Sequence, residues 1–175
     1  MTASPDSQTG PAQNSDIILR RPQINDGAAV HALIKACPPL DLNSTYAYLL
    51  LCHHFAETCV VAQKGGQLVG FISGYIPPTQ PNTFFVWQVA VHADARGCGL
   101  GNSMLHYLLQ QPASTSVQYV DTTVSPSNQA SRAMFARFAR SRDADITEKP
   151  LFTRAMFGNA AEHEDEMLLT IGPFH

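Results

Sequence analysis

Residues 86–101 of the chain are VWQVAVHADARGCGLG, an apolar strand that runs into a glycine-rich turn and then into a helix. Glycine allows left-handed backbone conformations and lets a ligand approach the chain closely. The amide groups at the start of a helix lack intrahelical partners and attract an anion. Arg96 can add a charge-assisted contact to the same anion. The segment therefore predicts a pyrophosphate site rather than a turn without a ligand.

Two other phosphate-binding motifs do not fit this turn. A P-loop requires Lys followed by Ser or Thr after its last glycine, but Asn102 and Ser103 follow Gly101. The dinucleotide-binding fingerprint requires the spacing GxGxxG. The spacing of Gly97, Gly99 and Gly101 differs from that fingerprint. We therefore expect the pyrophosphate to belong to another kind of ligand.

Hydrophobic periodicity and turn residues divide the rest of the chain into strands and helices. The strands are predicted at residues 17–21, 59–63, 67–76, 84–91, 117–124 and 167–171. The helices are predicted to begin at Asn25 or Asp26, at Ser44, at Leu100 and at Asn128. The order β-α-α-β-β-β-α-β-α-β predicts the α/β class, with helices on both faces of one mixed sheet.

Length and composition indicate one globular domain. The chain has 175 residues, of which 45% are apolar and 14% charged, and its formal net charge is -3. That supplies enough apolar material for one core and too little charge for a disordered protein. The scattered basic residues argue against a nucleic-acid or membrane partner. We expect a disordered tail over residues 1–15 and a single domain over residues 16–175.

Several features predict a cytoplasmic protein without a metal. No apolar stretch of the sequence reaches membrane-spanning length, and its polar start lacks the features of a secretory signal. The four cysteines show no CxxC spacing, so we expect neither disulfides nor a zinc site. Cys52 and Cys59 lie in apolar stretches and are predicted to pack in the core. His53 and His54 have no third ligand at a suitable spacing.

The segment 86–101 resembles the acyl-CoA-binding motif of the GNAT acetyltransferase superfamily, a strand ending Val-x-Val followed by Arg/Gln-x-x-Gly-x-Gly/Ala. A second element of the superfamily is a strand, an Asn and then a helix, which Asn128 matches together with Ser131 and Phe135. The resemblance covers nearly all of residues 16–157 and implies the GNAT fold, a mixed and mostly antiparallel sheet flanked by helices. It also implies acetyl-CoA as cosubstrate. The residues implied to bind acetyl-CoA are Val89, Ala90, Val91, Arg96, Gly97, Cys98, Gly99, Leu100, Gly101, Asn128, Ser131 and Phe135.

Four stretches point to one branch of this superfamily. They are PPLDLNSTYAYLLLCHHFAETCVVA (38–62), GFISGYIPP (70–78), FFVWQVAVHADARGCGLG (84–101) and HEDEMLL (163–169). These stretches resemble the L-2,4-diaminobutyrate acetyltransferases of ectoine biosynthesis. The resemblance implies acetylation of the γ-amine (N4) of L-2,4-diaminobutyrate and, as often in GNAT proteins, a homodimer. Two alternatives stay open: an acetyltransferase for another amine, such as a polyamine or an aminoglycoside, and a CoA-binding module without turnover.

The implied reaction is direct attack of the amine on the thioester, with the carbonyl oxygen polarised by a backbone N–H near Val89. The amine must lose a proton before it can attack. Many GNAT enzymes place a Glu on the strand before the glycine-rich turn, where this chain has Trp87 and Gln88. Many also have a Tyr where this chain has Phe135. The catalytic base and acid are therefore not assigned by the resemblance.

Six residues are candidates for catalysis or for binding the amine. The candidate bases are Asp41, Glu162, His163 and Glu164, and the candidate proton donor is Tyr46. Trp87 is expected to lie against a cationic group or the aliphatic chain of the substrate. The acidic run 162–166 is expected to close the pocket. The alternatives are core packing for Trp87 and a solvated loop for the run.

Overall fold

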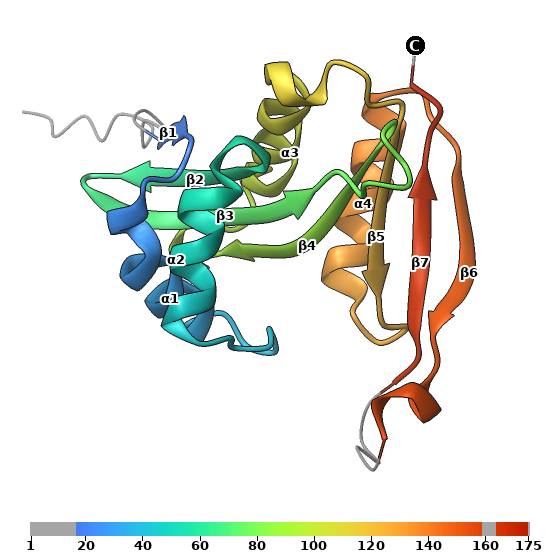
Figure 1. The fold of residues 1–175 in the computed structure, drawn as a ribbon, viewed down its shortest axis with the longest axis horizontal. Helices are drawn as coiled ribbons and strands as arrows, with labels where there is room; N and C mark the ends of the chain where they lie inside the picture. The colour runs from blue at the N-terminus through green and yellow to red at the C-terminus, as the bar shows by residue number, and fades with distance from the viewer. Residues whose placement is uncertain (1–16, 159–163, 175) are drawn as a thin grey trace, which may run out of the picture.

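Seven strands form one mixed sheet in the computed structural model, which describes residues 17–158 and 164–174. The strands are β1 (Ile17–Arg20), β2 (Cys59–Lys64), β3 (Gln67–Tyr75), β4 (Thr83–Val91), β5 (Tyr119–Val124), β6 (Ile146–Phe152) and β7 (Glu166–Ile171). Their order across the sheet is β1-β2-β3-β4-β5-β7-β6 (Figure 1). All neighbouring pairs in this part of the chain are antiparallel except β4 and β5, which run parallel.

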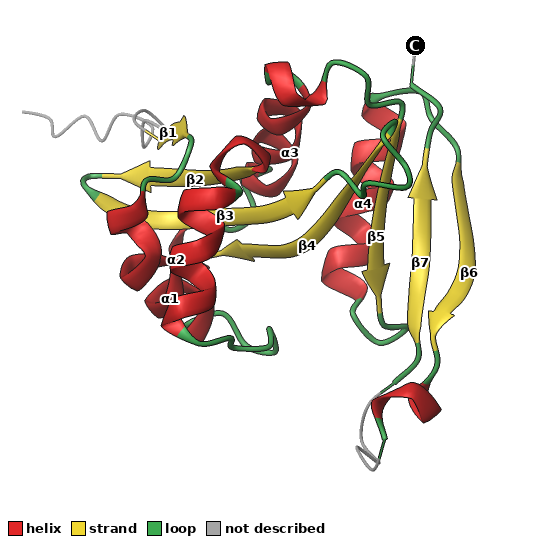
Figure 2. Ribbon diagram, viewed as in Figure 1, coloured by secondary structure: helices red, strands yellow, loops and turns green. Residues whose placement is uncertain are grey.

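Helices cover both faces of the sheet, as predicted (Figure 2). The α-helices are α1 (Gly27–Lys35), α2 (Thr45–His54), α3 (Leu100–Leu109) and α4 (Gln129–Ser141). Short 3-10 turns occupy η1 (Ile24–Asp26), η2 (Ala56–Thr58), η3 (Ala93–Ala95), η4 (Pro112–Ser114) and η5 (Arg154–Phe157). The apolar faces of α1 and α2 form one core with the sheet, and those of α3 and α4 form the other. The α/β class and the mostly antiparallel sheet are therefore confirmed.

Local signals place most helix starts correctly. The Ser44 side chain accepts a hydrogen bond from the Ala47 amide and caps α2, and Asn128 caps α4 in the same way through Ser131. The strand β6 was not predicted. It is largely exposed, carries Pro150 and lies at the edge of the sheet, so its sequence lacks the alternation that marks a half-buried strand.

The strands β4 and β5 diverge along their length, and this split positions the site (Figure 1). They pair only between Thr83–Val86 and residues 119–122. Beyond that point β4 continues to Val91 and β5 to Val124 without a ladder between them. The backbone groups on the facing edges of the two strands thus become accessible to a ligand.

A β-bulge in β4 lies at the start of this split. Ser73 of β3 pairs with Gln88, whereas Gly74 pairs with Val86, so Trp87 is the extra residue. The bulge exchanges the two faces of the strand: Val86 packs in the core beneath α3 and α4, but Gln88 faces α2. Trp87 is 48% exposed, which contradicts core packing for this residue.

Cys52 and Cys59 are buried as predicted. Burial raises the pKa of Cys52 to about 11 and that of Cys59 to about 12, so both thiols stay protonated and unreactive near neutral pH. Within the described ranges, no helix combines the length and the apolar character needed to cross a membrane.

Candidate active site

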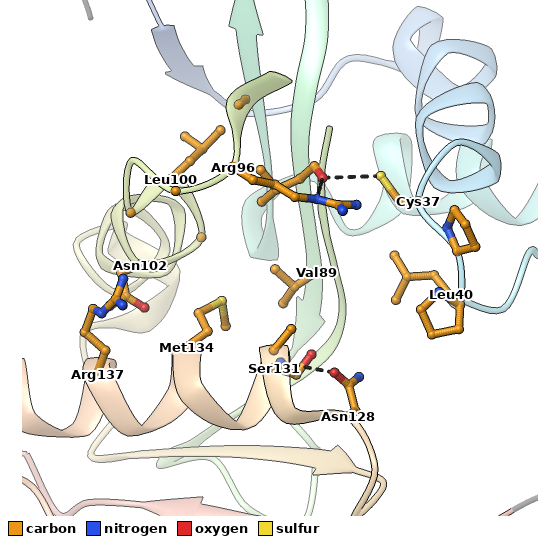
Figure 3. A pocket seen from close by; sticks show the side chains of 18 residues that line it. Cys37, Leu40, Val89, Arg96, Leu100, Asn102, Asn128, Ser131, Met134 and Arg137 are labelled. Atoms are coloured by element: carbon orange, nitrogen blue, oxygen red, sulfur yellow. Dashed lines mark hydrogen bonds between the residues drawn. The ribbon is translucent and has the colours of Figure 1, made fainter. Parts of the chain in front are cut away.

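A cavity of about 360 Å³ lies between the end of β4, the start of α3 and the first turns of α4 (Figure 3). The loop that follows α1 closes its remaining side with Pro38, Pro39 and Leu40. This is the cavity into which the predicted anion site opens, and we call it the CoA cavity.

The glycine-rich turn has the geometry of an anion site. Gly97 and Gly99 have φ angles of 81° and 78°, in the left-handed region that disfavours other residues. A Cβ atom at either position would meet nothing within 4 Å, so backbone conformation rather than crowding requires glycine. The first intrahelical hydrogen bond of α3 joins the Ser103 amide to the Gly99 carbonyl at 3.1 Å. The preceding amides are therefore left for a ligand.

Positive charge and hydrogen-bond donors surround the same cavity. Arg96 and Arg137 line it, and no Asp or Glu does so among the described residues. The Arg96 Nε donates to the Val91 carbonyl at 3.0 Å, which fixes the guanidinium at the cavity (Figure 3). The Asn128 Oδ1 accepts from the Ser131 amide at 3.1 Å, so the amide nitrogen of Asn128 remains as a donor toward a ligand.

The split between β4 and β5 presents a backbone N–H to the cavity. The His92 amide donates to the Val69 carbonyl of β3 at 2.8 Å. Because backbone groups alternate along a strand, those of Val91 and Val89 face the opposite edge, where β5 has diverged. The Val91 carbonyl accordingly accepts from Arg96 rather than from a strand. The Val89 N–H is thus placed to donate to a carbonyl oxygen held in the split.

A second cavity, of about 830 Å³, lies on the other side of the split, and we call it the acceptor cavity. It shares Pro39, Leu40, Asn128 and Ala130 with the CoA cavity, so the two cavities are adjacent. Three acidic residues line it, and no Lys, Arg or His does so in the described part of the chain. The acidic residues are Asp41, Glu164 and Glu166.

Buried hydrogen bonds hold the loop that carries Asp41. Gln88 is 6% exposed, and its Nε2 donates to the Asp41 carbonyl at 2.8 Å. The buried Tyr48 hydroxyl lies 3.4 Å from Gln88 Oε1 and accepts from the Asn43 amide at 3.2 Å. Gln88 lines the acceptor cavity, but it does not replace the missing Glu of the superfamily, because a carboxamide is not a base and this one holds the loop that carries Asp41.

The start of β7 and the residues just before it bring two carboxylates, Glu164 and Glu166, to the same cavity. Glu164 Oε2 accepts from the Ser127 amide at 3.1 Å, which ties the start of β7 to the loop before α4. Asp165 Oδ1 accepts from the Arg154 amide at 2.6 Å, which joins the residue before β7 to the start of η5. Glu164 and Glu166 of the predicted acidic run thus line the cavity, and Glu164 and Asp165 are also exposed to solvent.

The structure brings together most, but not all, of the predicted site residues. Those that line the acceptor cavity are Asp41, Trp87 and Glu164. Those that line the CoA cavity are Val89, Val91, Arg96, Gly97, Gly99, Leu100, Gly101, Asn128 and Ser131. Glu162 and His163 lie outside the described residues.

Four predicted residues do not line either cavity. Tyr46 is 69% exposed in the first turn of α2, while Ala90 is buried against α1 and α2. Phe135 is 2% exposed in the core beneath α3 and α4. The exposed Cys98 donates to the Ala95 carbonyl at 3.1 Å.

Sequence reasoning missed Tyr48, Gln88 and Arg137. Tyr46 and Tyr48 are two residues apart, a spacing that puts side chains on different faces of a helix. Only one of them can therefore face the core, and Tyr48 continues the apolar stripe toward Leu51 and Cys52. That stripe is the signal that distinguishes the two tyrosines in the sequence.

The comparisons with known proteins agree with this geometry. A sequence model of the acetyltransferase (GNAT) family matches residues 28–139. The chain therefore belongs to the GNAT acetyltransferase family.

Individual relatives within this family share one name. The chain is 55% identical to an L-2,4-diaminobutyric acid acetyltransferase of Bordetella parapertussis, over 98% of this chain and 92% of the relative. It is 43% identical to the protein of that name from Marinococcus halophilus, over 90% and 91% of the two chains. A solved structure, the diaminobutyrate acetyltransferase EctA from Paenibacillus lautus in complex with L-2,4-diaminobutyric acid and coenzyme A, matches with a TM-score of 0.88. Its sequence is 43% identical, and the match covers 91% of this chain and 96% of that one.

Proposed function

We propose that the protein transfers the acetyl group of acetyl-CoA to the γ-amine of L-2,4-diaminobutyrate, giving N4-acetyl-L-2,4-diaminobutyrate in ectoine biosynthesis. One observation carries this proposal: an arginine-lined cavity and a carboxylate-lined cavity meet at the β4–β5 split. The first suits the phosphates of CoA and the second suits an ammonium-bearing acceptor. The names of the relatives and the ligands of the Paenibacillus lautus enzyme support the same substrates.

The residues suggest how the chain assists the reaction. Acetyl-CoA supplies the thioester, whose carbonyl carbon the amine nitrogen attacks as the C–S bond breaks and the CoA thiolate leaves. The Val89 N–H is placed to stabilise the negative charge that develops on the carbonyl oxygen. Juxtaposing the two substrates at the split can account for roughly 7–11 kcal/mol of the barrier.

The ammonium must also give up a proton before attack. Asp41 and Glu164 are the described candidates for the base, since both line the acceptor cavity. Glu162 and His163 stay candidates, whereas the exposed position of Tyr46 gives no support to a role as proton donor.

The test is an assay of thiol release from acetyl-CoA with a panel of amines. The panel contains L-2,4-diaminobutyrate, 2,3-diaminopropionate, ornithine, lysine, spermidine and an aminoglycoside. We expect the highest kcat/KM with L-2,4-diaminobutyrate, and mass spectrometry should place the acetyl group on N4. A higher kcat/KM with another amine would contradict the substrate, and binding of acetyl-CoA without any turnover would favour the non-catalytic module.

We also propose that the protein is a cytoplasmic homodimer. Residues Cys37, Cys52, Cys59 and Cys98 are all free thiols, as expected in a reducing compartment. Both edges of β7 are paired, so this strand has no free edge with which to extend the sheet to a second copy. The free edge on that side of the sheet belongs to β6, beside the exposed Ile146 and Phe152. Light scattering on the eluting protein measures the oligomeric state.

A further inference from the structure

A third cavity, of about 500 Å³, lies between the β3–β4 connection, β5 and β6. Aromatic and apolar side chains form most of its wall, namely Tyr75, Phe85, Trp87, Leu151, Phe152 and Leu168. The one acidic residue in its described lining is Asp121 of β5.

One oxygen of the Asp121 carboxylate is buried without a partner in the described part of the chain. The residue is 8% exposed, and its Oδ1 has no hydrogen-bond partner within residues 17–158 and 164–174. The described lining of the cavity contains no Lys, Arg or His. Lys149 of β6 lies beside Leu168 on the neighbouring strand, but it is exposed and does not line the cavity. An unpaired buried carboxylate is unfavourable and therefore calls for a cation from outside the chain.

The third cavity is adjacent to the acceptor cavity. Trp87 and Thr123 line both the third cavity and the acceptor cavity. Thr123 and Asp121 lie two residues apart on the same face of β5, a separation of about 7 Å along a strand. A short diamine in the acceptor cavity can thus extend past Trp87 toward Asp121.

We propose that Asp121 is the anionic subsite for the ammonium group that is not acetylated, an inference that rests on the proposed diamine acceptor. The reacting nitrogen then lies at the β4–β5 split, and the second nitrogen lies against the Asp121 carboxylate. The faces of Tyr75, Phe85 and Trp87 suit an organic ammonium, which aromatic rings attract. A divalent metal would require several oxygen ligands, and Asp121 is the only carboxylate in the described lining.

The variant Asp121→Asn tests the subsite because it removes the charge and keeps the shape. We expect it to raise the KM for L-2,4-diaminobutyrate by about tenfold to a hundredfold, the range for a hydrogen bond to a charged group. The KM for acetyl-CoA should not change. Wild-type protein should strongly prefer L-2,4-diaminobutyrate over 4-aminobutyrate, which lacks the α-amine, and the variant should lose that preference by the same factor.

Two further variants complete the design. Asp145→Asn removes the same charge from an exposed position at the start of β6 and should behave as wild type. Asp121→Ser is a second substitution in case the Asn variant folds poorly. Both Asp121 variants should melt at or above the wild-type temperature, since they remove an unpaired buried charge.

Binding measured without turnover separates this inference from the proposed function. With CoA present, L-2,4-diaminobutyrate should raise the melting temperature of the wild type but not that of Asp121→Asn. If the wild type is stabilised but does not acetylate the diamine, the reaction is wrong and the subsite stands. Equal stabilisation of both proteins, no stabilisation of either, or an unchanged preference over 4-aminobutyrate would overturn the subsite. Loss of the dimer in the variant with unchanged KM would instead make Asp121 an interface residue.

Discussion

The CoA cavity and the acceptor cavity are neighbours, but they are assembled in different ways. Half of the residues that line the CoA cavity come from one contiguous segment, residues 89–102, and the others come from the loop after α1 and from α4 with its cap. The acceptor cavity collects residues from the loop after α1, the bulge of β4, the loop before α4 and the start of β7. The first carries arginines and the second carboxylates. The glycine-rich part of the CoA cavity therefore depends on local backbone geometry, whereas the acceptor cavity depends on tertiary packing.

The largest effect that we expect comes from breaking the local geometry of the CoA cavity with Gly99→Val. A β-branched residue is strained at a φ of 78°, so the turn must leave the conformation that directs its amides at the anion. The KM for acetyl-CoA should rise at least about a hundredfold, since each lost bond to a charged group is worth about 1.5–3 kcal/mol. Steady-state kinetics with both substrates measure this.

Gly66→Val is the matched control for this change. Gly66 has a φ of 85° in the β2–β3 turn, and a Cβ there also meets nothing within 4 Å. It should cause a similar loss of stability without a change in the KM for acetyl-CoA. A similar rise of that KM in both variants would show that strain alone, rather than the anion site, explains the effect.

An intermediate effect is expected from Gln88→Met, which tests the tertiary support of the acceptor cavity. The Asp41 carbonyl and the Tyr48 hydroxyl lose their buried partner, which should lower the free energy of unfolding by about 1–3 kcal/mol. The loop carrying Asp41 is then released, so the KM for the amine should rise about tenfold, a change of about 1.4 kcal/mol.

The KM for acetyl-CoA should stay constant in Gln88→Met. The control variant Gln67→Met, at the exposed start of β3, should change neither the KM for the amine nor that for acetyl-CoA. Equal changes in both constants would show that the two cavities do not act separately.

The smallest effect is expected from Asp26→Asn, which lies outside both cavities. Arg20 binds the Asp26 carboxylate through two hydrogen bonds, of 2.7 and 2.9 Å, and thereby lowers the pKa of Asp26 below its usual value. A lowered folded-state pKa adds stability that is present above the unfolded pKa of about 4 and is lost as the pH falls through the folded pKa. The variant should lose about 1 kcal/mol at pH 7, with unchanged kinetics.

The pH dependence provides the check on the Asp26 prediction. Urea unfolding between pH 7 and pH 3 should show the difference between wild type and Asp26→Asn shrinking below about pH 4. Asp145→Asn, at an exposed carboxylate, should follow the wild type over the same range. A difference that grows on acidification would contradict the ion pair as the source of the stability.

The fold could be predicted almost completely because its signals are local. The helix caps at Ser44 and Asn128 depend on residues three positions apart. The buried strands show apolar runs that periodicity can detect. The strand β6 escaped prediction since an exposed edge strand has no buried face to pattern its sequence.

The predictions of site residues also succeeded where the signal was local and failed where it was not. Arg96, Gly97 and Gly99 were assigned from one motif, and the structure lines the CoA cavity with them. Phe135 and Ala90 were assigned to acetyl-CoA from the same resemblance, but a motif position does not say which face of an element a side chain occupies. Both lie in the core.

The order of every strand and α-helix except β6, the glycine-rich turn and the resemblance to the acetyltransferase family could be predicted from the sequence, because each depends on residues close together in the chain. The candidates Asp41, Trp87 and Glu164 could be proposed from the sequence, but their meeting in one cavity depends on the tertiary structure. The bulge at Trp87 reverses the faces of β4, and the divergence of β5 opens the split. Packing then gathers Asp41, Glu164 and Asp121 from three distant segments around it. The apolar periodicity of one strand does not reveal in which register that strand pairs, or which distant strands it meets, because pairing depends on residues elsewhere in the chain.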